Sequence, residues 1–336
     1  PLPPLALTMG EPAGIGPEIT LKTWAARHTQ ALPPFFVIGD PDLYRNLASS
    51  LGLDIPVETV AAPAGAAALF ARALPVLPLV LAERPRPGHL APANARMVIE
   101  AIDTACDLTL AGKTSGLVTN PIHKRALYEA GLRVPGHTEY LAARSGGATP
   151  VVMLSCPDLR VVPVTVHQPL KYAASWLITG MIAEKGVILA RALRFDLGID
   201  RPRIAVAGLN PHAGEEGHLG REEIDIVAPA LDAIRHAGAE VAGPLSADTM
   251  FHAAARARYD AALCMYHDQA LIPLKTIGFE HGVNTTLGLP LVRTSPDHGT
   301  ALDIAGRGHA HPGSLIEAVR LAGIIAHNRA HHRIAP

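Results

Sequence analysis

The chain has 336 residues, of which 49% are hydrophobic and 18% are charged, and its formal net charge is -1 at pH 7. This length predicts two domains or one large α/β domain, and the composition is that of a well-buried globular protein, which excludes a disordered chain. A charge balance so near zero gives no reason to expect nucleic acid or an anionic membrane as a partner, so any phosphate site must be built locally.

Short apolar runs alternate with helix-period segments along the whole chain. The expected strands are residues 5–9, 34–40, 77–82, 116–119, 151–154, 161–166, 203–207 and 261–265. Helices are expected from Pro17, from Pro41, over residues 94–110, near residue 313, and over a segment whose apolar face is Ile224, Val227, Leu231 and Ile234. This alternation predicts an α/β fold with buried parallel strands and helices on both faces of the sheet.

Three glycines lie between the first expected strand and its helix, in GEPAGIGP at residues 10–17. Pro17 suits a first helical turn, where its missing N–H is not needed, and free amides at such a helix start can bind a phosphate or a carboxylate. The spacing differs from the G-x-G-x-x-G of dinucleotide-binding folds, and a tight turn that needs glycine only for its backbone angles is an equal alternative. Its position after a first strand favours a ligand site.

Three histidines follow expected strands, where open α/β sheets build their sites: His167, His212 and His267. Three imidazoles and an open position make a catalytic metal site. The chain has 17 histidines, so hydrogen-bonded loop histidines are the competing interpretation, and the residues alone leave both open. A fourth histidine, His137, precedes Thr138, a fair helix N-cap, and is expected to be exposed and to contact an anionic group.

Single polar residues flanked by apolar ones come next, at Lys275, Asn284 and Arg293, as if strands delivered them into a pocket. Lys275, one of only six lysines, is expected to bind an anion or to transfer a proton, and Arg293 offers bidentate geometry for a carboxylate or phosphate. An edge lysine and a surface arginine are the plainer alternatives. The glycine-rich loop DHGTALDIAGRG at residues 297–308 suits a nucleotide better than a mere connection.

The three cysteines, at positions 106, 156 and 264, form neither a CxxC pair nor an even-numbered set, so they are expected to be reduced and mostly buried. The most apolar stretch, residues 66–82, is interrupted by Arg72 and two prolines and does not predict a membrane span. The N-terminal sequence has neither the basic start nor the apolar run of a signal peptide. A cytoplasmic location is therefore expected.

Several of these segments together resemble known families. GIGPE at residues 14–18 and HGTALDIAG at 298–306 resemble the paired signatures of the isocitrate and isopropylmalate dehydrogenases. GHTE at 136–139, NPHAGE at 210–215, MYHDQ at 265–269 and GVNTTLGLP at 282–290 resemble the 4-hydroxythreonine-4-phosphate dehydrogenase family of pyridoxal phosphate biosynthesis, in order and over almost the whole chain. The chain departs from that family's usual pattern at Glu11, where aspartate is common, and at Ala270, where glycine is expected.

The resemblance implies two α/β/α domains with a cleft between them, as in isocitrate and isopropylmalate dehydrogenases. The first would comprise residues 1–130 and 275–336, and the second, with the dimer interface, residues 131–274. It further implies NAD or NADP as cofactor, one divalent metal ion per subunit (zinc, magnesium or cobalt), and a homodimer with a shared site to which His267 is contributed across the interface. The implied reaction oxidises and decarboxylates 4-phosphohydroxy-L-threonine to 3-amino-2-oxopropyl phosphate.

The same resemblance assigns roles to particular residues. The implied metal ligands are His167, His212 and His267. The implied substrate contacts are His137, Thr138, Lys275, Asn284 and Arg293. The nucleotide is expected near Gly14, Gly16, His298, Gly299, Thr300 and Asp303. Lys275 is the candidate for proton transfer, with Asp248 and Asp268 as supporting carboxylates.

Other activities stay open at this point. Relatives with these motifs act on D-threonate or D-erythronate 4-phosphate, or on a terephthalate-derived diol, so related four-carbon acid phosphates are alternative substrates. A phosphotransacetylase-like acyltransferase has a similar overall fold and would need neither metal nor nicotinamide. A protein that closes on a small anion without chemistry is a third class, disfavoured by the missing export signal.

Overall fold

The structure is a computed structural model that describes residues 1–332 of the chain. It divides into two compact units, the first formed by Pro1–Pro150 with Leu289–His327 and the second by Val151–Gly288 with the chain from Asn328. Both units are therefore discontinuous in sequence. The boundaries expected from sequence fell at 130/131 and 274/275.

Unit 1 is built on a parallel sheet. Its strands, in spatial order, are β3 (Val57–Thr59), β4 (Leu74–Pro78), β2 (Phe35–Gly39), β1 (Leu5–Thr8), β5 (Leu117–Val118) and β12 (Arg293–Pro296). The pairings among them are parallel throughout. Strands β1 and β2 are buried along their whole length, which is why they appear in the sequence as continuous apolar runs rather than as alternating patterns.

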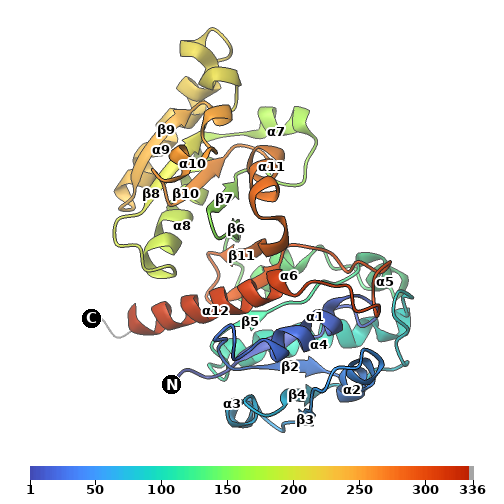
Figure 1. Ribbon diagram of the computed structural model, residues 1–336. Helices are drawn as coiled ribbons and strands as arrows, with labels where there is room; N and C mark the ends of the chain where they lie inside the picture. Colours follow the sequence, from blue (N-terminus) through green and yellow to red (C-terminus); the bar gives the residue numbers. More distant parts are fainter. Residues whose placement is uncertain (333–336) are drawn as a thin grey trace. The chain divides into compact units, whose positions relative to one another are not determined.

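The helices of unit 1 follow these strands along the chain (Figure 1). They are α1 (Gly16–Ala25), α2 (Pro41–Ser50), α3 (Ala66–Leu69), α4 (Ala95–Leu110), α5 (Lys124–Glu129), α6 (His137–Arg144) and most of α12 (Gly313–His332). Local chemistry sets several of these starts. Asp40 caps α2 by accepting a hydrogen bond from Asp42 N, and prolines lie in the first turns of α1 and α2.

Unit 2 has a mixed sheet. Its strands, in spatial order, are β11 (Val283–Leu287), β6 (Val151–Cys156), β7 (Leu159–Pro163), β10 (Ala261–Cys264), β8 (Arg203–Ala207) and β9 (Glu240–Leu245). Strand β6 is antiparallel to both β11 and β7, whereas β7, β10, β8 and β9 are parallel. The expectation of parallel strands throughout is therefore wrong for β6, which is joined to β7 by a tight turn with no room for a crossover helix.

Helices cover both faces of the unit 2 sheet. They are α7 (Leu170–Trp176), α8 (Thr179–Phe195), α9 (Ala228–His236), α10 (Ala253–Arg256) and α11 (His267–Gly278). Successive residues of β10 point to opposite faces. Leu263 packs in the cluster that contains residues of α8 and α9, and Cys264 packs in the cluster that contains residues of α11.

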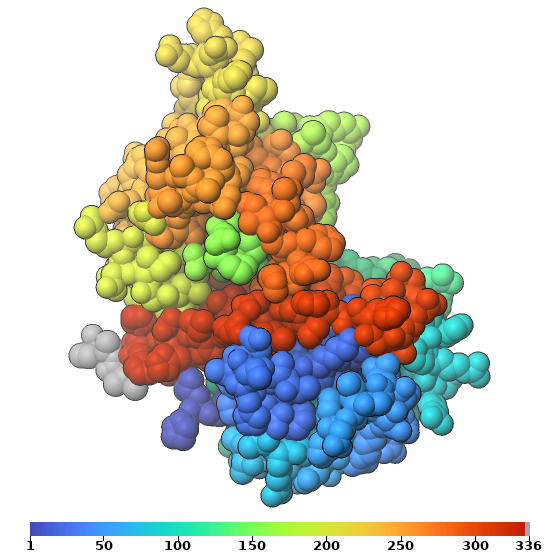
Figure 2. All heavy atoms as spheres, in the orientation of Figure 1, coloured from blue at the N-terminus to red at the C-terminus, as the bar shows by residue number. Residues whose placement is uncertain are grey.

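One segment of unit 2 projects from the body of that unit. It contains Pro211–Gly217 and is drawn in yellow in Figures 1 and 2. His212, Ala213, Glu215 and Glu216 all have positive φ, between 45° and 56°, and Gly214 has φ 80°. Left-handed backbone is unfavourable for residues with a Cβ, so this segment stores strain.

Several local expectations are corrected by the structure. The strand expected at 77–82 is β4, which ends at Pro78, and the strand expected at 161–166 ends at Pro163. After β7, Val164 is still buried although it no longer pairs as strand, whereas after β4 the chain turns outward and Val80 is 74% exposed. Ile224, expected on a buried helix face, is 43% exposed, because residues 223–227 form a π-turn that rotates it outward.

Among the described residues, no single helix is long and apolar enough to cross a membrane, and only α7 with α8 meets that test as a pair, bent by 92°. The three cysteines are free and buried.

Candidate functional site

A buried arginine is the centre of the predicted anion site in unit 1. The Arg293 side chain, at the start of β12, is 3% exposed, and its Nε and Nη2 donate to Thr119 Oγ1 at 3.2 and 2.9 Å. Burial lowers the pKa of Arg293 to about 10, while the nearby Glu139 carboxylate opposes that shift. A guanidinium fixed in this way presents a planar pair of donors to a carboxylate or phosphate.

His137 lies close enough to Arg293 to feel its charge. Burial, and then the positive charge of Arg293, hold the pKa of His137 well below its usual value of 6.5. The ring Nε2 is buried and has no hydrogen-bond partner among the described residues. A neutral imidazole therefore stands beside a guanidinium with one ring nitrogen left for a ligand.

Two expectations about this helix start are wrong. The N-cap of α6 is Gly136, so Thr138 is the second residue of the helix and not its cap. His137 is half-buried rather than exposed. His137 is the first residue of α6, so the positive end of the helix dipole acts on its ring in addition to the charge of Arg293.

The depressed pKa of His137 predicts a pH dependence of folding. The unfolded chain takes up a proton near pH 6.5 that the folded chain does not bind, so stability falls as the pH drops below about 6.5. Between pH 7.5 and 5.5, the unfolding free energy of the wild type should fall by about 1 kcal/mol more than that of His137→Asn. Urea unfolding at both pH values measures this, with the exposed His28→Asn as control. Equal pH slopes for wild type and His137→Asn would contradict the assignment.

Two of the predicted metal ligands come together in unit 2. The rings of His167 and His267 have centroids 5.6 Å apart and line the same cavity of about 450 Å³, with Leu170 and Ala173 of α7. Asp268 Oδ1 lies 2.7 Å from His267 Nδ1. If the carboxylate accepts there, Nδ1 carries the proton and Nε2 keeps its lone pair, the second-shell arrangement usual for a metal-binding histidine. The chemistry of both rings therefore fits that of ligands to a divalent ion.

The third histidine, His212, is held apart on the projecting segment. Glu223 fixes the base of this segment, because its Oε1 accepts from Asn210 N at 2.6 Å and its Oε2 accepts from Asn210 Nδ2 at 3.0 Å. Any side chain at Gly214 would clash with that carboxylate, since a Cβ there would lie 2.5 Å from Glu223 Oε2. Within residues 1–332 of one chain, no three His, Cys, Asp or Glu side chains gather closely enough to hold an ion.

The other predicted residues of unit 2 lie on several elements. Asn284, on β11, has a buried Oδ1 without a hydrogen-bond partner among the described residues, so it offers an acceptor to a ligand. Asp248 is in a short turn after β9 and accepts from Ser246 Oγ at 2.6 Å. Lys275 is on helix α11, not on a strand as expected, about two turns beyond His267.

The glycine turn after β1 packs tightly on the 298–306 loop. Ile15 N donates to Thr300 O at 2.9 Å, and a Cβ at Gly14 would lie 2.9 Å from the same oxygen. Gly16 is similarly close to Asn120. The amides of residues 11, 13, 14 and 15, which precede the helix start, all donate to acceptors inside the unit.

The chain just after the 298–306 loop is held by Glu18 and Lys22, two residues that the sequence did not single out. Buried Glu18 accepts from Gly308 N and Ala310 N at 2.8 and 2.7 Å, and Lys22 donates to the carbonyls of the same two residues. The scarcity of lysine was a signal that applied to Lys22 as well. His298 and Asp303 lie on the accessible part of this loop.

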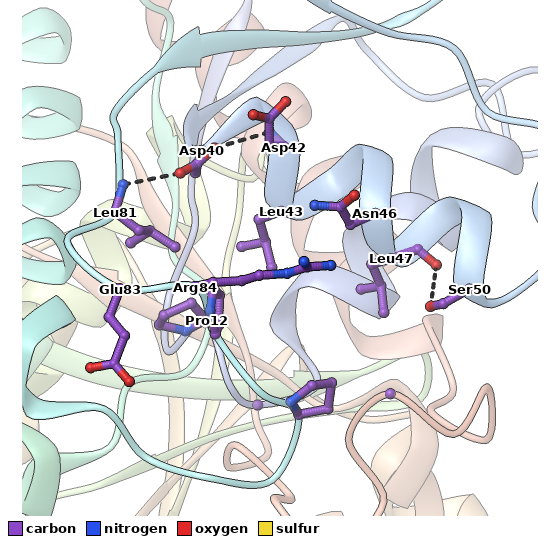
Figure 3. Close-up of a pocket in the computed structure, with 14 residues that line it drawn as sticks. Pro12, Asp40, Asp42, Leu43, Asn46, Leu47, Ser50, Leu81, Glu83 and Arg84 are labelled. Carbon is purple, nitrogen blue, oxygen red and sulfur yellow. Dashed lines mark hydrogen bonds between the residues drawn. The ribbon is translucent and has the colours of Figure 1, made fainter.

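A cavity of about 570 Å³ borders this turn and loop at Gly14 and Gly306 (Figure 3). Its apolar walls include Leu43 and Leu47 of α2. Arg84, which has no hydrogen bond or ion pair within the described chain, reaches across the cavity toward α2, and Asp40 is tied to Asp42 N and Leu81 N. The cavity lies at the carboxyl ends of β1, β2 and β4, where parallel sheets place ligands.

The fold is that of a known class of oxidoreductase. A solved 4-hydroxythreonine-4-phosphate dehydrogenase from Klebsiella pneumoniae has a TM-score of 0.86 and 39% identity, and the likeness covers 97% of this chain and 98% of that one. A terephthalate 1,2-cis-dihydrodioldehydrogenase from Burkholderia xenovorans LB400 has a TM-score of 0.67 and 28% identity over 96% and 98% of the two chains.

The sequence comparisons are more specific. A 4-hydroxythreonine-4-phosphate dehydrogenase of Caulobacter vibrioides is 52% identical over 332 residues, which are 97% of this chain and 98% of that protein. The family model described as pyridoxal phosphate biosynthetic protein PdxA matches residues 31–322. The chain belongs to this PdxA family.

Proposed function

We propose that the protein is a 4-hydroxythreonine-4-phosphate dehydrogenase, which oxidises and decarboxylates 4-phosphohydroxy-L-threonine to 3-amino-2-oxopropyl phosphate in pyridoxal 5'-phosphate biosynthesis. Full-length relatives near 50% identity carry that name. The observation that carries the proposal is a buried polar atom without a partner among the described residues, His137 Nε2, at one of the residues expected to contact substrate. A buried polar atom without a partner is costly, and a ligand removes that cost.

In this proposal the chain's own residues bind and orient the substrate. Arg293 holds the phosphate by two charge-assisted hydrogen bonds, and neutral His137 donates or accepts beside it. When bound, a divalent ion held by His167, His212 and His267 would acidify the substrate hydroxyl and stabilise negative charge on its oxygen, and the nicotinamide of NAD or NADP would accept the hydride.

The proposal assigns the proton transfer to Lys275. Oxidation releases the hydroxyl proton along with the hydride, and loss of carbon dioxide leaves a carbon that must be protonated. Lys275 is the residue proposed to deliver that proton, with Asp248 and Asp268 as supporting carboxylates. The reaction therefore balances as one hydride to the cofactor, one carbon dioxide and one proton returned to carbon.

The cofactor is assigned to unit 1. We place the adenosine half of NAD or NADP in the cavity of Figure 3, against Leu43 and Leu47, with the rest of the cofactor along Gly14 and Gly16 toward His298, Gly299, Thr300 and Asp303. An apolar cavity with a few polar groups, at the carboxyl ends of parallel strands, suits a nucleoside.

This placement of the cofactor predicts that one added methyl group at Gly14 weakens the binding of NAD. Gly14→Ala forces the turn away from Thr300, because the new Cβ would lie 2.9 Å from its carbonyl oxygen. KM for NAD should rise about tenfold, equivalent to about 1.4 kcal/mol of binding, with little change in metal affinity. Initial rates at varied NAD measure this. Gly180→Ala, on α8 with open space around it, is the control. An unchanged KM for NAD in a folded Gly14→Ala enzyme would mean that the cofactor does not bind at this turn.

We also propose a homodimer whose sites are shared, with His267 completing the histidine set of the partner. Large apolar side chains are exposed on α7 and α11 and just after these helices: Trp176 is 55% exposed and Phe279 74%, with Leu170, Ile178 and Ile272 similarly exposed. The same two helices carry residues that line the cavity of His167 and His267. Exposed apolar patches of this kind mark protein contacts. The unpaired, buried cysteines support a reducing compartment, the cytoplasm.

A substrate panel tests the activity directly. 4-Phosphohydroxy-L-threonine, D-threonate 4-phosphate, D-erythronate 4-phosphate and a terephthalate-derived cis-diol are compared for NADH formation and carbon dioxide release. The proposal expects the first to have the highest kcat/KM by at least about 100-fold. A higher value for another substrate would reassign the enzyme within its fold, and turnover without NADH would exclude a dehydrogenase.

A further inference from the structure

A line of hydrogen bonds joins the carboxyl ends of the four parallel strands of unit 2. From β7 to β10, Thr165 Oγ1 donates to Met265 O at 2.7 Å. From β10 to β8, Met265 N donates to Gln269 Oε1 and Gln269 Nε2 donates to Gly208 O, both at 2.7 Å. From β8 to β9, Gly208 N donates to Leu245 O at 2.7 Å.

Each link lies a few residues before a predicted site residue. Thr165 precedes His167 by two positions and Met265 precedes His267 by two. Gly208 precedes His212 by four, and Leu245 precedes Asp248 by three. Since one extended residue spans at most about 3.5 Å, these links limit how far each site residue can move relative to the others.

The side chain of Gln269 forms the middle part of this line of hydrogen bonds. The paired register of β10 with β8 runs only to Leu263 and Val206. Beyond it, the Gln269 amide continues the ladder, because its oxygen accepts from one strand end and its nitrogen donates to the other. Among side chains, only Gln and Asn offer a planar acceptor and donor of this kind.

We propose that Gln269 is a positioning residue that fixes the turn bearing His212 relative to the turn bearing His267. This rests on the proposed function, in which His212 binds the divalent ion of its own chain's site and His267 binds that of the partner's site. The strain of the His212 segment gives the reason: a left-handed run of non-glycine residues persists only when its surroundings over-determine it. Glu223 holds that segment from within its own loop, and Gln269 ties its base to the rest of the sheet.

Metal affinity of the whole protein tests the inference. Co²⁺ is titrated into the metal-free enzyme and followed by its visible absorption, and the thermal midpoint of the metal-free form is measured beside it. Gln269→Met, which keeps length but neither hydrogen bond, should weaken Co²⁺ binding about 10- to 100-fold, the usual effect of removing an outer-shell partner. Its Co²⁺ spectrum should change as well.

A second variant separates position from charge. Gln269→Glu keeps the acceptor for Met265 N but turns a carboxylate oxygen toward Gly208 O. The added negative charge alone would tighten Co²⁺ binding, whereas a displaced turn weakens it. Weaker binding supports the positioning role, and tighter binding overturns it.

The control is Asn328→Leu, which removes a side-chain hydrogen bond of similar length, from Asn328 Nδ2 to Asp196 O at 2.8 Å, elsewhere in unit 2. It should lower the thermal midpoint without changing Co²⁺ affinity. If Gln269→Met does not fold, Thr165→Val tests the neighbouring link of the same line, with the same expected loss. Wild-type affinity in the folded variants would overturn the inference, and a wild-type enzyme that binds no Co²⁺ would overturn the proposed metal site and the inference with it.

Discussion

Replacing His212 with alanine should abolish divalent-metal retention and NADH production together. The imidazole of His212 is one of three proposed ligands, and its loss leaves an ion held by the remaining two, with a fall in kcat/KM of about 1,000-fold or more. Metal content after gel filtration and the rate of NADH formation are the measurements. Full activity of His212→Ala after treatment with a chelator would end the metal assignment.

Mixing inactive variants tests whether the three histidines come from two chains. His212→Ala mixed with His267→Ala, and His167→Ala mixed with His267→Ala, should regain activity, because one site of each hybrid dimer is intact if His267 acts across the interface. His167→Ala mixed with His212→Ala should stay inactive, since those two would belong to the same chain. Recovery only in this last mixture, or in none after verified subunit exchange, contradicts the assignment of His267.

Arg293→Lys should lower kcat/KM for the phosphorylated substrate by about 100- to 1,000-fold. Lysine keeps the charge but not the planar fork that Thr119 orients, so two charge-assisted hydrogen bonds to the phosphate are lost or weakened, at about 1.5–3 kcal/mol each. Most of the loss should appear in KM. Steady-state kinetics and phosphate inhibition measure it.

Arg144→Lys is the matched control for this substitution. Arg144 belongs to the same unit, where it forms ion pairs with Asp103 and Asp107. It should leave kcat/KM within about twofold of wild type. Equal effects of the two substitutions would mean that Arg293 acts on stability rather than on the substrate.

The sequence was most informative where one kind of force dominates. Continuous apolar runs predicted β1, β2, β8 and β10 to within a residue, because a strand buried on both faces leaves no other pattern. Motif resemblance identified the family, and the comparisons confirm it. The antiparallel place of β6 was missed, since its residues are as apolar as those of its parallel neighbours.

Side-chain roles that depend on partners far away in the chain could not be predicted from the sequence. Nothing near Arg293 in sequence indicates Thr119, which is 174 positions away, and nothing near Glu18 indicates the 308–310 backbone that it holds. Gln269 was read only as part of a motif, and its bond to Gly208 depends on two strands being neighbours in space. The metal ligands, the cofactor place and the shared dimer site stay predictions.

The division of unit 1 into two stretches of chain has a consequence for how the enzyme is made. A ribosome completes residues 1–150 and the Val151–Gly288 stretch of unit 2 before β12 and α12 emerge. Until then β5 has no neighbour on the side that β12 will occupy, and Thr119 has no guanidinium to hold. The proposed substrate-binding cation is thus among the last parts synthesised, so a nascent chain that ends before Arg293 would lack the group proposed to hold the substrate phosphate.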